Sequence, residues 1–293
     1  MKPRHLLFLM TINVVWGLNV VASKYAVTAI GPLTATFLRF SIALAVLVPF
    51  LKWQHGRMRA IFVTALFAGA LFLAVTSTSL KVADNVSALA IAGQLGVPFS
   101  LILGIVFLGE RIRWPRLIGI GLSFAGIVVM GFDPALFDER LGLLLTVVAA
   151  FLWALGSLLF RRLAGIPALT IYAWLAAVSA PCLLLASLIA EPGELQRAAG
   201  LPVSTFGWIA FSALGSSVMG QGGMAWLVQR YPISTIAPLT LVSPLLAVIF
   251  ATLAFHNPLT PRMIGGGVLM LIGIAIITVR TAQARDRGEG IAA

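Results

Sequence analysis

Residues 94–121 read QLGVPFSLILGIVFLGERIRWPRLIGIG, and residues 240–267 read TLVSPLLAVIFATLAFHNPLTPRMIGGG. The second stretch follows the first at a distance of 146 positions, and the two share identical residues that include prolines and glycines. The identical pairs are Leu95 and Leu241, Pro98 and Pro244, Pro115 and Pro261, Arg116 and Arg262, Ile118 and Ile264, Gly119 and Gly265, and Gly121 and Gly267. Proline and glycine constrain or free the backbone, so their repetition is informative. Each copy has two apolar runs around a short polar turn, which predicts a pair of membrane-spanning helices in each half of a duplicated protein.

The composition excludes a water-soluble globular domain. Hydrophobic residues make up 60% of the chain, charged residues 10%, and the mean hydropathy is +1.04, whereas soluble domains carry about 25% charged residues. The net charge of +11 does not indicate nucleic-acid binding, because the basic residues punctuate apolar segments and a basic patch needs a polar surface. The predicted surroundings are a lipid bilayer.

Ten segments are apolar enough to cross that bilayer, for which about 20 mainly apolar residues are needed. They lie at 6–27, 33–51, 60–80, 85–108, 115–132, 142–160, 168–190, 206–227, 234–255 and 261–279. Asn13, Trp16 and Asn19 interrupt the first apolar core, which favours a retained helix over a cleaved signal peptide. The predicted fold class is therefore an all-α membrane protein with ten transmembrane helices.

The duplication divides the ten helices into two sets of five. We expect the first five-helix repeat at 1–138, the second at 139–282, and a disordered tail at 283–293, where Arg285, Asp286, Arg287 and Glu289 gather. Because five is an odd number, the second repeat starts from the opposite side and is inverted. Inverted repeats are typical of secondary transporters, which bind their substrate near the membrane midplane between the repeats.

The basic residues predict the orientation. With both termini in the cytoplasm, the inner segments carry fourteen Lys and Arg residues and the outer loops carry four. The inner ones are Lys2, Arg4, Lys52, Arg57, Arg59, Arg111, Arg113, Arg116, Arg161, Arg162, Arg230, Arg280, Arg285 and Arg287, and the outer ones are Lys81, Arg140, Arg197 and Arg262. The positive-inside rule therefore places both termini in the cytoplasm.

Two further stretches carry a family resemblance. Residues 16–43 read WGLNVVASKYAVTAIGPLTATFLRFSIA, and residues 108–122 read LGERIRWPRLIGIGL. With the two-fold five-helix plan, they resemble the EamA-type branch of the drug/metabolite transporter superfamily, and within it the bacterial exporters of amino acids, aromatic ones in particular. The resemblance implies a central cavity between the halves and export by alternating access. It also implies that the protein lies in the bacterial cytoplasmic (inner) membrane. A monomer is compatible with this plan.

Polar and aromatic side chains inside the spans are the predicted substrate-binding residues, because lipid penalises polar groups. The candidates are Trp16, Asn19, Gln94, Trp153 and Gln221. The two tryptophans lie at matching places near the starts of the two halves and would form aromatic walls. The alternative for each residue is interhelical hydrogen bonding and packing.

Lys24 and Arg39 are the charges closest to membrane depth. Either could bind a substrate carboxylate or serve the structure, Lys24 by snorkelling to the interface and Arg39 by capping helix carbonyls. The family resemblance places an arginine at the position of Arg39. Pro98 and Pro244 lie at matching mid-helix positions, where proline removes a backbone hydrogen bond; they are either hinges or simple kinks.

No Asp or Glu falls within a predicted span. Proton-coupled exporters usually carry such a carboxylate, so the expected mechanism is facilitated uniport, with a proton-coupled exporter of drugs or other metabolites as the alternative. An intramembrane hydrolase is less favoured: His5, His55 and His256 lie outside the spans, and only His256 lies near a span end that Ser216 or Ser217 could approach. Cys182 is the only cysteine, and no cluster with metal-ligand spacing is present, so neither a metal nor a cofactor is predicted.

Overall fold

The computed structural model describes residues 1–109, 114–257 and 259–286. The polar turn at 110–113, inside the first copy of the repeat, and the end of the tail at 287–293 lie outside the described residues. The described part contains ten helices that are long and apolar enough to cross a membrane. The sequence prediction of an all-α protein with ten spans is therefore confirmed.

Six spans are formed by single α-helices or nearly so, and the third, fourth, eighth and ninth are composite. The first, second, fifth, sixth and seventh spans are α1 (Pro3–Ala29), α2 (Pro32–Leu47), α7 (Trp114–Gly131), α8 (Arg140–Arg161) and α9 (Ala168–Ala190). The third is α3 (Met58–Thr64), a π-helical segment (Ala65–Leu71) and α4 (Phe72–Val82); the fourth is α5 (Val86–Ala92), a 3₁₀ turn (Gly93–Leu95) and α6 (Gly96–Leu108). The eighth is α11 (Val203–Ala210), a π-helical segment (Phe211–Gly220) and α12 (Gln221–Val228); the ninth is α13 (Ile233–Thr240) and α14 (Val242–Phe255). The tenth is α15 (Pro261–Asp286), and the short α10 (Glu194–Ala198) lies between the seventh and eighth.

The ends of the spans follow from local sequence. Proline occupies the first turn of α1 and α2, where its missing N–H has no helical partner in any case. α6 ends at Gly109 in the left-handed conformation, with φ 64°, which glycine adopts without strain. α15 continues to Asp286, beyond residue 283, the predicted start of the disordered tail.

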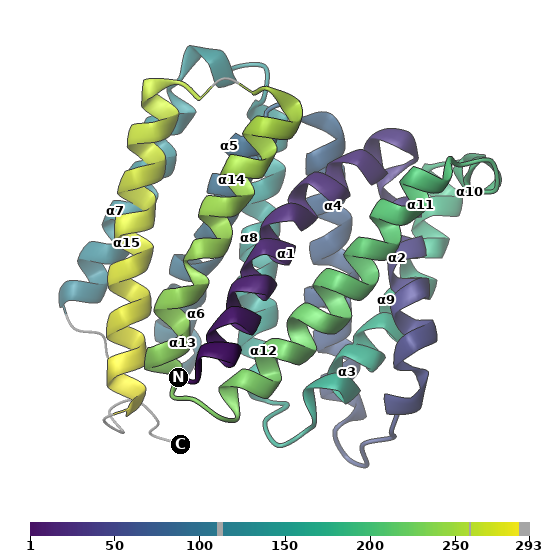
Figure 1. Cartoon of the computed structure of the whole chain (residues 1–293), viewed down its shortest axis with the longest axis horizontal. Coiled ribbons are helices and arrows are strands. Elements are labelled where there is room, and N and C mark those ends of the chain that lie inside the picture. Colours follow the sequence, from purple (N-terminus) through teal and green to yellow (C-terminus); the bar gives the residue numbers. More distant parts are fainter. Residues whose placement is uncertain (110–113, 258, 287–293) are drawn as a thin grey trace.

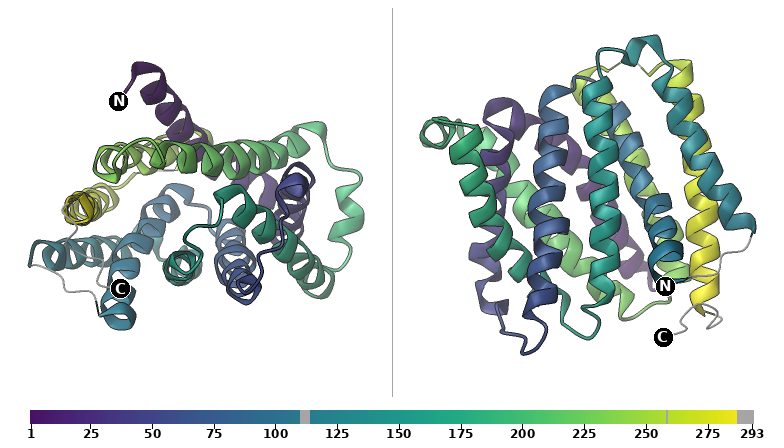
Figure 2. Two further views of the ribbon diagram at one scale, coloured as in Figure 1. Left: turned by 90° about the horizontal axis from the view of Figure 1, so that it is seen from below. Right: turned by 180° about the vertical axis from the view of Figure 1, so that it is seen from behind.

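The helices pack with approximate two-fold symmetry. The second span of each half contacts the second span of the other, α2 against α9, and the fifth contacts the fifth, α7 against α15. The first span packs along the ninth (α1 on α14), and in the same way the sixth packs along the fourth (α8 on α5 and α6). Figures 1 and 2 show α7 and α15 at one edge of the molecule and α2 and α9 toward the other. This pattern is the one expected of two inverted five-helix repeats.

Glycines allow α7 and α15 to pack backbone to backbone. A Cβ atom at Gly119 would lie 2.8 Å from the carbonyl oxygen of Gly273, and one at Gly126 would lie 2.8 Å from the backbone nitrogen of Met270 and would also touch the carbonyl oxygen of Gly266. Gly119 therefore lies opposite Gly273 and Gly126 opposite Gly266, which is an antiparallel arrangement. Close approach at small residues is the usual basis of helix association in membranes.

Two irregularities repeat at the distance of 146 positions. The π-helical segments of the third and eighth spans begin at Ala65 and Phe211, and the α-helix is interrupted near Leu95 in the fourth span and at Leu241 in the ninth. Each interruption lies three residues before a proline, Pro98 or Pro244. Proline cannot donate a hydrogen bond to the carbonyl four residues earlier, so the interruption lies where this bond is missing.

Candidate functional site

A cavity lies between the two halves of the molecule, and the space within it that is free of protein atoms, including space open to solvent, is about 530 Å³. The first half contributes side chains from α2 and the third span, and the second half contributes side chains from α8, α9 and the eighth span. Its lining includes Arg39, Phe72, Trp153, Tyr172, Ser217 and Gln221. We call it the inner cavity, because it extends from Arg39 toward Leu47, at the end of the molecule that carries the N-terminus.

Arg39 is the only charged residue in this lining. Its guanidinium donates two hydrogen bonds to Ser217 Oγ, from Nη2 at 3.0 Å and from Nε at 3.3 Å. Within the described part of the chain no carboxylate pairs with it. The side chain is partly buried, and a charge that is withdrawn from water without a counter-ion is unfavourable. Arg39 is thus a strong attractor for an anionic group that enters the cavity, and its planar fork suits a carboxylate.

Tyr172 and Gln221 form a second polar group in the same cavity. The Tyr172 hydroxyl donates to Gln221 Oε1 at 2.9 Å. This bond orients the amide and uses one lone pair of its oxygen, and Gln221 Nε2 has no hydrogen-bond acceptor among the described residues. The amide can therefore donate to a ligand, and the tyrosine oxygen retains lone pairs that can accept from one.

Trp153 and Phe72 form an aromatic wall. Their ring centroids are 5.2 Å apart, a separation typical of favourable aromatic pairs. Gly96 makes room for the indole ring, since a Cβ atom there would lie 3.0 Å from Trp153 Cδ1. The cavity thus combines a cation, an amide and an apolar wall, all of which a neutral or zwitterionic solute with an apolar side chain can use.

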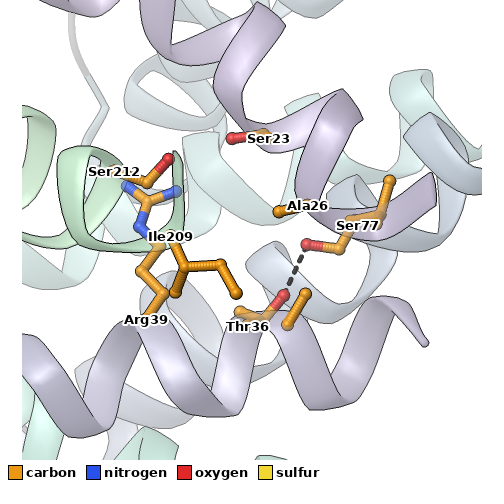
Figure 3. A pocket seen from close by; sticks show the side chains of 9 residues that line it. Ser23, Ala26, Thr36, Arg39, Ser77, Ile209 and Ser212 are labelled. Atoms are coloured by element: carbon orange, nitrogen blue, oxygen red, sulfur yellow. Dashed lines mark hydrogen bonds between the residues drawn. The ribbon is translucent and has the colours of Figure 1, made fainter. Parts of the chain in front are cut away.

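A smaller cavity of about 250 Å³ lies on the other side of Arg39. Ser23, Thr36, Ser77 and Ser212 bring hydroxyl groups into its lining, and Arg39 is common to both cavities. Figure 3 shows the guanidinium of Arg39 and the hydroxyl of Ser212 at one end and the Thr36–Ser77 hydrogen bond at the other. We call it the outer cavity, because Ser23 and Thr36 lie near the ends of α1 and α2 that are remote from the N-terminus.

The loops at that remote end are joined by carboxylates. Glu191 accepts from the backbone nitrogens of Leu33 at 2.8 Å and Thr34 at 2.9 Å. Glu139 accepts from the backbone nitrogens of Asp84 and Asn85, each at 3.0 Å. Each glutamate belongs to the second half by sequence and binds the first half, at the start of α2 or of α5. These bonds satisfy helix N-terminal N–H groups and hold the two halves together at this end.

Three of the predicted binding residues do not line either cavity. Trp16 donates from Nε1 to the carbonyl oxygen of Ser216 at 3.3 Å, and its ring lies against Gly220, where a Cβ atom would be 3.2 Å from Cδ1. Gln94 donates to Ala90, one turn back in its own span, at 3.5 Å. Asn19 buries its Oδ1 without a partner among the described residues. Trp153 and Gln221, by contrast, line the inner cavity.

Lys24 donates hydrogen bonds to the end of a neighbouring helix. It is 8% exposed, and its Nζ donates to the carbonyl oxygens of Leu80 at 2.9 Å and Ala83 at 2.6 Å. These carbonyls lie at the C-terminal end of α4, where the helix leaves acceptors unsatisfied and the helix dipole favours a cation. Of the two alternatives for Lys24, the geometry favours the structural one.

Tyr172, Ser217, Ser212 and Phe72 belong to the two cavities but were not among the predicted residues. Hydroxyl groups are frequent in these spans, and many donate to their own helix backbone, so their sequence positions do not distinguish them. Tyr172 carried the only usable signal, as a polar aromatic residue at the start of the seventh span. Within the described residues no group of three His, Cys, Asp or Glu side chains could hold a metal.

Comparison with known proteins supports the same class of molecule. Residues 4–132 and 140–279 each match the EamA-like transporter family. The chain is 26% identical over 275 residues to a "Probable amino-acid metabolite efflux pump" of Escherichia coli (strain K12), covering 90% of this chain and 91% of that protein. It is 27% identical over 270 residues to the "Uncharacterized inner membrane transporter YedA" of the same organism, covering 89% and 81% respectively.

A solved structure shares the fold. A crystal structure matches 98% of this chain and 100% of its own with a TM-score of 0.65 and 19% identity, which supports the arrangement of helices and no more. The family match falls separately on each half of the chain, in agreement with the duplication read from the sequence. The chain belongs to the EamA-like transporter family and is a membrane transporter, not an enzyme.

Proposed function

We propose that this transporter exports amino acids, including aromatic and hydrophobic ones, and similar small metabolites. It acts by alternating access of two inverted halves and as a facilitated uniporter. The observation that carries the proposal is Arg39, a partly buried guanidinium in the cavity between the halves with no carboxylate partner among the described residues. An α-carboxylate would supply the missing counter-charge.

The remaining lining fits the rest of such a solute. The apolar side chain of an amino acid would lie against Trp153 and Phe72, and its polar backbone groups would contact Gln221 and Tyr172. The name of the Escherichia coli relative, an amino-acid metabolite efflux pump, agrees with this substrate class. A permanent cation fits less well, because the lining contains no acidic residue and does contain Arg39.

The packing supports the transport geometry. The inner cavity lies on the side of Arg39 that faces the end of the molecule with the N-terminus. At the opposite end, Glu191 and Glu139 join the two halves by hydrogen bonds. Opening these contacts while the inner cavity closes would expose Arg39 to the other side of the membrane. We place both termini in the cytoplasm of a bacterial cell, so the solute would move outward across the cytoplasmic membrane, and we expect a monomer to suffice.

Counterflow in proteoliposomes tests the proposal. Vesicles with purified protein are loaded with one unlabelled amino acid, diluted, and supplied with a trace of the labelled amino acid outside. A panel of aromatic, aliphatic and acidic amino acids and a set of cationic drugs is run at one pH. Transient accumulation of an aromatic or aliphatic amino acid is expected. Counterflow of the cationic drugs alone would support the drug-exporter alternative instead.

A further inference from the structure

The outer cavity contains a hydrogen-bond donor that has no acceptor among the described residues. Ser212 is 2% exposed, lines the cavity, and its Oγ has no partner among the described residues. Many other hydroxyls in the spans donate to the carbonyl four residues earlier, as Ser41, Ser100 and Ser123 do at 2.7–2.9 Å. Ser212 lies in the π-helical segment of the eighth span, an irregularity that is frequent at functional sites.

The hydrogen bonds of the outer cavity show which of its hydroxyl groups still have a hydrogen to donate. Thr36 Oγ1 donates to the carbonyl oxygen of Pro32 at 2.7 Å. A hydroxyl has one hydrogen, so Thr36 must accept in its 2.6 Å contact with Ser77, and Ser77 is the donor. Neither hydroxyl then has a hydrogen to offer to the cavity. Ser23 makes no side-chain hydrogen bond within the described part of the chain, so its hydroxyl hydrogen is available to a ligand. The hydroxyl hydrogen of Ser212 is available for the same reason.

Arg39 adds the charge at the same place. Its Nε and Nη2 donate to Ser217, on the side of the inner cavity. A guanidinium has five N–H donors, so hydrogens remain for the outer cavity, where Arg39 and Ser212 lie together (Figure 3). No Asp or Glu contributes to this lining. One cation and two hydroxyl donors without an acid form the environment of an anion.

The size of the cavity limits what that anion can be. The centre of a water-sized sphere can occupy only about 20 Å³ of it, which leaves room for about one water molecule or an ion of similar size. We infer that the outer cavity is a binding site for one small monovalent anion, a carboxylate group or a chloride ion, held between Arg39 and Ser212 with Ser23 as a further donor. A carboxylate in this site would belong to the solute during export, and this alternative rests on the proposed function. A chloride ion would be independent of the solute.

Anion binding is measured without transport, so that its failure is distinct from a failure of the proposed function. The protein is purified in detergent, and its thermal unfolding is followed by tryptophan fluorescence. Sodium chloride or sodium acetate replaces sodium isethionate, a larger sulfonate, at constant ionic strength. The expected result is a saturable rise of Tm with chloride, with acetate or with both. The more effective probe identifies the source of the anion.

Variants tie the effect to the cavity. In Ser212→Ala the half-saturating anion concentration should rise roughly tenfold or more, the effect of one hydrogen bond to a charged group. Ser41→Ala is the matched control: it removes a hydroxyl from α2 that bonds only to its own helix and should leave the titration unchanged. If Ser212→Ala is recovered in low yield, Ser23→Ala provides the second test. No saturable rise above isethionate, or equal titrations in the wild type and both cavity variants, would overturn the inference.

Discussion

Replacing Lys24 by methionine separates the structural role of this residue from a role in transport. Methionine keeps the length of the side chain but removes the charge and the donors. The variant therefore loses the hydrogen bonds from Nζ to Leu80 at 2.9 Å and to Ala83 at 2.6 Å. The carbonyls at the end of α4 would then be left without these partners, at a site that is 8% exposed in the wild type.

The expected loss of stability is the difference between two effects. Each hydrogen bond to a charged group contributes about 1.5–3 kcal/mol, and the interaction with the end of a helix adds about 0.3–2 kcal/mol. Removing the ammonium also removes the cost of burying it, which is of several kcal/mol. We expect the free energy of unfolding to fall by a net of about 1–3 kcal/mol, in the usual range of single substitutions.

The assay combines stability with transport. Unfolding is titrated with SDS in mixed micelles, and KM and maximal rate are measured in proteoliposomes with equal amounts of folded protein. Lys81→Met is the matched control: Lys81 lies at the same end of α4, is exposed, and donates to Thr28 at 3.3 Å, so its loss should change stability by no more than about 0.5 kcal/mol. Lys24→Met should keep the wild-type KM. Unchanged stability with a raised KM, or loss of a pH dependence present in the wild type, would refute the structural role.

Three further predictions concern orientation, the inner cavity and coupling. With Cys182 replaced by serine, His55→Cys and Ala199→Cys, both at exposed positions, should be labelled by an impermeant maleimide from opposite sides of the membrane; labelling of residue 55 in intact cells would reverse the orientation. Trp153→Ala and Gln221→Ala should lower the rate of transport at least severalfold without lowering protein yield, whereas normal transport by both would place the substrate elsewhere. An inward proton gradient at fixed membrane potential should leave the steady accumulation of a zwitterionic amino acid unchanged, because no Asp or Glu lies within a span of the described chain; sustained uphill transport driven by that gradient would exclude uniport.

The sequence was sufficient to predict the spans and their inverted duplication. About 20 apolar residues are needed to cross a bilayer, and the repeated Pro98 and Pro244 set the register of the two halves. The structure shows that two backbone irregularities also repeat at the distance of 146 positions. They are the helix interruptions and the π-helical segments beginning at Ala65 and Phe211. The π-helical segments have no sequence signature and could not be predicted.

The binding residues were harder to predict, because a helix that is apolar on all sides gives no periodic signal for the side that faces the cavity. Trp153 and Gln221 line the inner cavity, whereas Trp16, which occupies the matching position in the first half, donates to Ser216. The two halves are thus not in equivalent surroundings at these positions. Ser212 could be singled out only after the hydrogen bonds of the other hydroxyls were known.

The central claim is that Arg39 binds the carboxylate of the exported solute. It is tested most directly by comparing an amino acid with its own amide in the counterflow assay, using phenylalanine and phenylalaninamide. The wild-type protein should carry phenylalanine and bind the amide at least about 30-fold more weakly, because truncating one member of a buried charge pair costs about 2–5 kcal/mol. Arg39→Gln should lose this discrimination and retain the fold by size-exclusion chromatography. Equal transport of the acid and the amide by the wild type would contradict the account.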